Sequence, residues 1–236
     1  MWQLGIGARG KFDRDSAWLF NVFAQFYAWF SAHTAWRASC GLLATHLPEP
    51  AAGRGLTVLD LGCGPGVSTF EMARQRPDAF YVGLDRAPRM LNEARRQQRR
   101  AGARAWRIAW LRGDAASLPF AAASLDALTG HSLLYLLGEP TRSRALPEML
   151  RVLRPGGRVV LMEPSARPVS LGQVLGVSAD PRHLVSVLLW RPFSRLHVRY
   201  TPASLSSTLA RVGFIDTRVG EVLGGLGLMA CANKPV

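Results

Sequence analysis

Residues 56–66 read Leu-Thr-Val-Leu-Asp-Leu-Gly-Cys-Gly-Pro-Gly, and this stretch decides the fold. The apolar run at 56–61 predicts a buried strand, and residues 68–76 predict a helix directly after the glycine turn. Glycines in such a turn let a ligand approach backbone N–H groups at the carboxyl edge of a sheet. A tight turn would explain these glycines alone, so the rest of the chain must decide between the two interpretations.

Short strands and helices alternate after this loop. Strands are predicted at 80–85, 108–111, 125–130, 158–162, 213–219 and 226–232, and helices at 87–100, 142–153 and 205–211. Pro155-Gly156-Gly157 predicts a helix stop immediately before the strand at 158–162. Residues 164–200 do not fit the alternation and are interpreted as an insertion. The pattern predicts an α/β fold with a mostly parallel sheet covered on both faces.

Two acidic residues follow predicted strands and favour the ligand-binding interpretation. Asp85 ends the strand at 80–85, where a carboxylate can accept hydrogen bonds from both ribose hydroxyls. Asp114, in Gly113-Asp114-Ala115, follows the strand at 108–111, where a carboxylate can accept from an adenine amino group. The loop and both acids therefore predict a nucleoside site. A second glycine pattern, at 5–10, has no strand before it and is assigned no role.

Six ordered motifs resemble those of class I S-adenosylmethionine-dependent methyltransferases, in the methyltransferase type 11 group that includes ubiquinone and menaquinone methyltransferases. They are Val58-Leu-Asp-Leu-Gly-Cys-Gly-Pro-Gly66, Val82-Gly-Leu-Asp85, Gly113-Asp-Ala115 with Leu118-Pro-Phe120, Leu125-Asp-Ala127, Met149-Leu-Arg-Val-Leu-Arg-Pro-Gly-Gly157, and Thr201-Pro202 with Gly213-Phe214. The resemblance implies a Rossmann-like, doubly wound sheet of seven strands with an antiparallel last strand. It also implies an N-terminal helical cap at 1–50 and a methyltransferase domain at 51–236, in which 164–200 forms a substrate lid.

The resemblance implies S-adenosylmethionine as the cofactor, S-adenosylhomocysteine as the product and a set of binding residues. The residues expected to bind the cofactor are Asp60, Gly62, Cys63, Gly64, Gly66, Asp85, Arg86, Met90, Asp114, Ala115 and His131. The loop lacks the Lys-Ser/Thr pair that a triphosphate and magnesium require, so nucleotide hydrolysis is not expected. No metal site is expected.

The methyl acceptor is left open by the sequence. A general base is needed only if the acceptor arrives protonated, and His131 and Tyr135 are the catalytic candidates, with Glu163, His183 and His197 behind them. Tyr27, Trp29 and Tyr200 are expected to contact the substrate. An apolar cap and lid would suit either a phospholipid amine or an isoprenoid quinone as the methyl acceptor. The alternative acceptors are an RNA base and a soluble metabolite.

The net charge of the chain indicates which kinds of partner it attracts. The chain of 236 residues has 29 Lys+Arg, of which 27 are arginine, against 16 Asp+Glu, and its net charge is +13. Such an excess attracts polyanions, either an anionic membrane surface or nucleic acid. A small-molecule, lipid-like substrate at a membrane surface is favoured over nucleic acid, because the base-methylation signature is missing after the strand at 125–130. Three separate cysteines and the lack of a signal sequence predict a cytoplasmic protein. The positive charge adds the expectation that it is peripheral to the inner face of the membrane. Its oligomeric state is not predicted.

Overall fold

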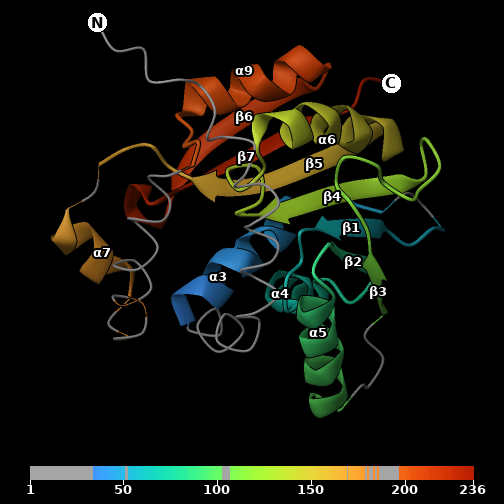
Figure 1. The fold of residues 1–236 in the computed structure, drawn as a ribbon, viewed down its shortest axis with the longest axis horizontal. Coiled ribbons are helices and arrows are strands. Elements are labelled where there is room, and N and C mark those ends of the chain that lie inside the picture. The colour runs from blue at the N-terminus through green and yellow to red at the C-terminus, as the bar shows by residue number, and fades with distance from the viewer. Residues whose placement is uncertain are drawn as a thin grey trace, which may run out of the picture.

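A computed structural model describes residues 34–50, 53–102, 107–168, 170–178, 180, 183, 185 and 197–236. Seven strands form one sheet in the order β3-β2-β1-β4-β5-β7-β6 (Figure 1). Their bounds are β1 Thr57–Leu61, β2 Phe80–Asp85, β3 Ile108–Arg112, β4 Leu125–His131, β5 Leu153–Pro164, β6 Ile215–Val222 and β7 Gly227–Asn233. Strands β1 to β5 pair in parallel, and β7 is antiparallel to both β5 and β6. The predicted seven-stranded α/β sheet with an antiparallel last strand is confirmed.

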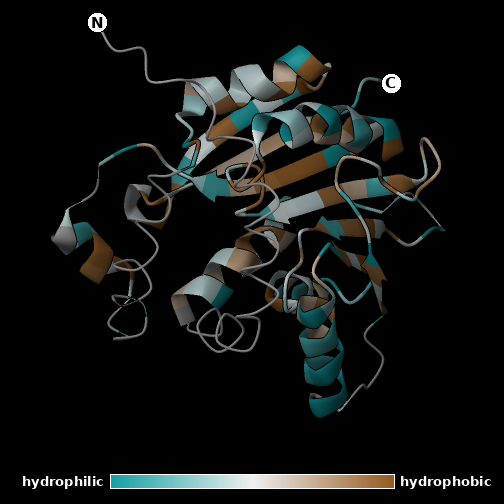
Figure 2. Cartoon of the chain, viewed as in Figure 1, coloured by the Kyte–Doolittle hydropathy of each residue, from teal (hydrophilic) through white to brown (hydrophobic). Residues whose placement is uncertain are grey.

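Helices cover both faces of the sheet. Figure 1 shows α3 (Thr34–Leu42), α4 (Val67–Gln75) and α5 (Pro88–Arg100) on one side, and α6 (Glu139–Val152) and α9 (Pro202–Val212) on the other. Successive strand residues point to opposite faces, so Val58 packs with Leu43 and Met72 on the first side, while Leu59 packs with Met149 on the second. The central strands β1, β2 and β4 are therefore buried on both faces, whereas α5 is largely hydrophilic, as Figure 2 shows.

Several predicted boundaries are wrong by a few residues, those of α9 and β6 among them, and the largest difference lies between α6 and β5. The helix predicted at 142–153 is α6, which begins at Glu139 and ends at Val152, and β5 begins at Leu153 rather than at residue 158. The glycines lie inside the sheet because Gly156 N–H donates to Lys234 O (3.0 Å) and Lys234 N–H donates to Gly157 O (2.8 Å). The backbone of Pro-Gly-Gly is thus paired with the chain after β7 instead of forming a free turn.

The insertion leaves the sheet and returns to it at one point. Ser165, directly after β5, and Tyr200, directly before α9, form a parallel bridge. Between them lies α7 (Leu171–Val177), which Ser170 caps at its N-terminus. Most of the stretch 181–196 lies outside the described residues. In the part of the chain that the structure describes, no helix combines the length and apolar character that crossing a bilayer requires.

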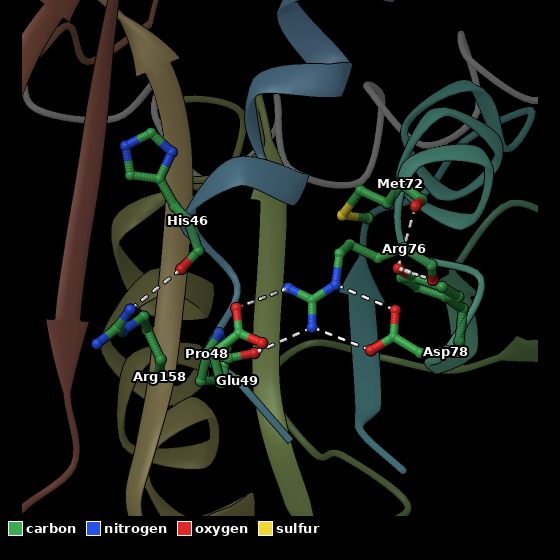
Figure 3. Close-up of polar contacts among 8 residues, drawn as sticks. His46, Pro48, Glu49, Met72, Arg76, Asp78 and Arg158 are labelled. Carbon is green, nitrogen blue, oxygen red and sulfur yellow. Dashed lines mark hydrogen bonds and ion pairs between the residues drawn. The ribbon is translucent and has the colours of Figure 1, made fainter.

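Arginine contacts fix the segment between α3 and β1, which includes the short helix η1 (Ala44–His46). Figure 3 shows Arg76, at the end of α4, paired with Asp78 at 3.0 Å and with Glu49 at 3.7 Å. Arg158 of β5 donates from Nη1 to the carbonyl of His46 at 3.3 Å. Since these contacts hold the chain that leaves α3, they also fix the C-terminal end of that helix against the sheet.

Candidate active site

A cavity lies at the carboxyl ends of the first four strands. Its walls are the loops after β1, β2, β3 and β4 and the residues leading into α6. Of the residues predicted from sequence to bind the cofactor, the following line it: Gly62, Gly64, Asp85, Arg86, Met90, Asp114, Ala115 and His131. Asp60, Cys63, Gly66, Tyr135 and Tyr200 do not line it, and Tyr27 and Trp29 lie outside the described residues.

Asp85 is held at the end of β2 by backbone donors. Its Oδ2 accepts from Gly64 N–H at 2.9 Å, and its Oδ1 accepts from Ala87 N–H at 2.8 Å. Burial raises the pKa of Asp85, while these N–H groups favour the charged form. Each carboxylate oxygen has a second lone pair, so the side chain can still accept from ribose hydroxyls inside the cavity.

Asp60 lies beneath the loop instead of in the cavity wall. It is fully buried and accepts from Ser68 Oγ (2.6 Å), Thr69 Oγ1 (2.5 Å) and Thr129 Oγ1 (3.1 Å). Burial raises its pKa, and the three hydroxyls oppose that shift. Asp60 thus ties the first turn of α4 to β1 and β4, which holds the glycine loop in place.

Close packing requires glycine at two places around this loop. Gly66 has φ +89°, and a Cβ there would lie 2.6 Å from Cη2 of Trp110. Gly62 has φ +71°, and a Cβ there would lie 2.7 Å from Cδ1 of Leu133. The Trp110 ring also meets Phe70 edge-on, with centroids 5.4 Å apart, and its Nε1–H donates to Gln98. Trp110 therefore supports the loop from below and is not a free stacking surface for nucleic acid.

The loop after β3 forms the end of the cavity that lies farthest from β4. Gly113 N–H donates to the carbonyl of Asp85 at 3.2 Å, which joins the loops after β2 and β3. Asp114 accepts from Ala116 N–H through Oδ1 at 2.9 Å and lines the cavity beside Ala115. Met90, on α5, is buried against the same end. An acidic acceptor flanked by apolar side chains suits a flat base that carries an exocyclic amine.

His131 ends β4 and meets helix α3. Its Nε2 lies 2.9 Å from Oγ of Ser39, and the indole of Trp36 packs against the imidazole with ring centroids 4.7 Å apart. Burial lowers the pKa of His131 to about 4, so the ring is neutral at pH 7. Its Nδ1 has no hydrogen-bond partner among the described residues. Ser39 and Trp36 lie far from His131 in sequence, and nothing in the sequence pattern pointed to them.

Glu163 shapes the loop that follows His131. From β5, its carboxylate accepts from the backbone N–H groups of Leu133 (3.1 Å), Leu134 (2.7 Å) and Tyr135 (3.2 Å). Burial raises the pKa of Glu163 to about 7. The loop so held carries Leu133 into the cavity wall, while Tyr135 points to the ring of His197, whose centroid is 5.7 Å away.

Tyr200 packs in the core behind the cavity wall. Its side chain is buried in the hydrophobic cluster that α6 and α9 share with the sheet. Burial raises the pKa of Tyr200 to about 12, so the phenol keeps its proton throughout the physiological range.

These features define a Rossmann-like α/β fold whose cavity is lined by two carboxylates and a neutral histidine. A family model described as a methyltransferase domain matches residues 58–157. The demethylmenaquinone methyltransferase of Desulfitobacterium hafniense (strain Y51) is 32% identical over 194 residues, covering 77% of this chain and 74% of that protein. The chain belongs to the class I S-adenosylmethionine-dependent methyltransferases.

Two further comparisons describe the range of relatives. The demethylmenaquinone methyltransferase of Lactococcus lactis subsp. lactis (strain IL1403) is 36% identical over 138 residues, and the match spans 58% of this chain but only 50% of that protein. Phosphoethanolamine N-methyltransferase 2 of Haemonchus contortus, solved with phosphomonomethylethanolamine and S-adenosylhomocysteine, has a TM-score of 0.68 at 16% identity. It covers 100% of this chain and 62% of that one, and the likeness shows the shared fold.

The residues of the cavity wall fit S-adenosylmethionine, because Asp85 and Asp114 are acceptors of the kind that a ribose and an adenine amine require. The protein is therefore an S-adenosylmethionine-dependent methyltransferase, as the sequence predicts.

Proposed function

We propose that this methyltransferase acts on a lipophilic, hydroxyl-bearing acceptor of the isoprenoid quinol type. The observation that carries the proposal is the composition of the cavity wall. Carboxylates lie at one end, and Leu133, Leu136 and Leu137 lie at the other, beside His131. An apolar wall next to one basic nitrogen suits a flat aromatic ring with a hydroxyl group. The relatives named demethylmenaquinone methyltransferases support the same class of acceptor.

The proposed chemistry asks little of the protein beyond placement. Bound S-adenosylmethionine supplies a methyl group on a positively charged sulfur, which is already activated. The leucine wall would orient the acceptor ring for in-line displacement and exclude water from it. Neutral His131 would take the acceptor's proton at Nδ1, the ring nitrogen that has no partner within the described residues.

The proposal includes a role for the N-terminal cap and the lid insertion. We assign the cover of the acceptor to residues 1–50 and 164–200, with Tyr27, Trp29, Tyr135 and Tyr200 as its aromatic contacts. Two observations support this assignment. Helix α3, at the end of the first segment, contacts His131, and His197, near the end of the second, contacts Tyr135. A cover of this kind would take its acceptor from an anionic membrane surface on the cytoplasmic side.

One transfer experiment tests the acceptor class. The purified chain receives S-adenosylmethionine labelled in the methyl group, together with one of four acceptors. These are a demethylated isoprenoid naphthoquinol kept reduced by borohydride, phosphatidylethanolamine vesicles, a small dicarboxylic acid, and total RNA. We expect label in the quinol pool alone, and label that the Asp85→Asn variant does not transfer. Label in any other pool, with none in the quinol, would replace the proposed acceptor by that one.

A further inference from the structure

Ser39 is a buried hydroxyl in direct contact with the candidate base. It lies on α3 and is 2% exposed. Its Oγ is 2.6 Å from the carbonyl oxygen of Trp36 and 2.9 Å from Nε2 of His131. The sequence separation between Ser39 and His131 is 92 residues, so tertiary packing of α3 on β4 creates this contact.

The two contacts together determine which nitrogen of His131 carries the proton. A serine hydroxyl has one proton to donate, and a carbonyl oxygen can only accept. The Ser39 proton is therefore committed to Trp36 O, and Oγ must accept from Nε2–H of His131. A neutral imidazole protonated at Nε2 carries its lone pair on Nδ1. In the opposite tautomer the single proton of Ser39 would have to serve both Trp36 O and the bare Nε2 of His131.

We propose that Ser39 is a positioning residue that holds His131 in the Nε2–H tautomer, so that its Nδ1 lone pair accepts the proton of the methyl acceptor. The inference rests on the proposed function. As the acceptor forms its bond to the methyl carbon, its own proton passes to Nδ1. The electron pair of the broken sulfur–carbon bond stays on sulfur, so one positive charge leaves the sulfonium and one appears on the imidazolium.

Helix α3 is anchored so that this geometry is held. The indole of Trp36 packs on the imidazole of His131 at 4.7 Å. The next residue, Arg37, pairs with the buried carboxylate of Glu71 on α4 at 2.6 Å. The ring of His131 is thus held by a tilted aromatic contact, a hydrogen bond and the pairing of α3 with α4. A base fixed in one tautomer needs no rearrangement before it accepts a proton.

Nitrogen-15 NMR of the full chain tests the tautomer without any acceptor. The chain has five histidines, and loss of a signal pair in His131→Gln assigns the relevant one. We expect wild type and Ser39→Thr to show a protonated Nε2 and a bare Nδ1, and Ser39→Ala to show both tautomers exchanging. A wild-type ring protonated at Nδ1 would overturn the proposal, even if every variant folds.

Kinetics on the quinol acceptor give the second readout. We expect Ser39→Ala to lower kcat at least tenfold with little change in the Kd of S-adenosylmethionine, and Ser39→Thr to recover most of kcat. The matched control is Ser124→Ala, because Ser124 also donates to the carbonyl three residues earlier, Ala121 at 2.7 Å, but lies outside the cavity wall. A wild-type kcat in Ser39→Ala would overturn the role of Ser39 but not the proposed function. If the wild-type protein transferred no methyl group to the quinol, the proposed function would be overturned, and the NMR result would then decide whether the tautomer is as proposed.

Discussion

The buried carboxylate of Glu163 makes the stability of this protein depend on pH in an unusual direction. Its side chain is 1% exposed, and burial raises its pKa from the ordinary value of 4.5 to about 7. A raised pKa means that the folded state binds a proton that the unfolded state has already lost. The stabilisation from this group is therefore fully present below pH 4.5 and is lost as the pH rises through 7.

The magnitude follows from the separation of the two pKa values. A shift of one pKa unit corresponds to about 1.4 kcal/mol, so moving from 4.5 to about 7 corresponds to about 3 kcal/mol. Glu163→Gln removes this titration. The carboxylate accepts from the backbone N–H groups of Leu133, Leu134 and Tyr135, and the substitution places an amide NH₂ opposite one of these donors. An unsatisfied buried donor costs about 1–3 kcal/mol.

Urea unfolding of both proteins at pH 5, 6, 7 and 8 measures the difference. We expect Glu163→Gln to be less stable than wild type at pH 5 and to close most of that gap by pH 8. Glu221→Gln is the control, because Glu221 is a partly exposed carboxylate paired with Arg167 at 2.6 Å. Its difference from wild type is expected to stay nearly constant with pH. A constant difference for Glu163→Gln as well would refute the reasoning, since it would mean that the three N–H donors cancel the effect of burial on the pKa.

Three further substitutions test the site and the sheet around it. Asp85→Asn should weaken S-adenosylmethionine binding at least tenfold in calorimetry, because hydrogen bonds to a charged group are worth about 1.5–3 kcal/mol; an unchanged Kd would contradict its role. Gly62→Ala should lower the free energy of unfolding by about 1–3 kcal/mol, since its Cβ would lie 2.7 Å from Leu133, and adding Leu133→Ala should recover part of that loss. Asp126→Ala should cost about 1–3 kcal/mol in chemical denaturation, because Thr57 N–H would lose its acceptor and two partly exposed arginines would lose their partner; an unchanged free energy of unfolding would count against these contacts.

The parts of the fold that sequence predicted well are those set by local pattern. Strands β1 to β4 lie within one residue of their predicted bounds, because each is a short apolar run that ends at a glycine or an acid. The start of β5 was missed because Pro155-Gly156-Gly157 is a stop signal only when its backbone is free. Here the chain end around Lys234, which is distant in sequence, pairs with it.

The site residues likewise divide into those that the local sequence predicts and those whose roles depend on tertiary contacts. Asp85 and Asp114 could be predicted because Asp85 ends a strand and Asp114 lies two residues after one, and strand ends meet at one edge of a parallel sheet. The roles of Ser39 and Glu163 could not, because each depends on a contact with a residue at least 28 positions away. The position of Trp110 is similar, since only the assembled sheet places its ring under the loop at Gly66.

The net charge of +13 takes on a different meaning once the cavity is known. The charged residues that line the cavity are two acids, Asp85 and Asp114, and one base, Arg86, while neutral His131 completes the set. S-adenosylmethionine carries a sulfonium and an ammonium against one carboxylate, so an arginine-lined cavity would repel it. The exposed arginines of α5 belong to a helix that Figure 2 shows as largely hydrophilic. Because Arg86 is the one arginine among the described residues of the cavity wall and most arginines of α5 are exposed, attraction to an anionic partner and binding of a cationic cofactor use different surfaces.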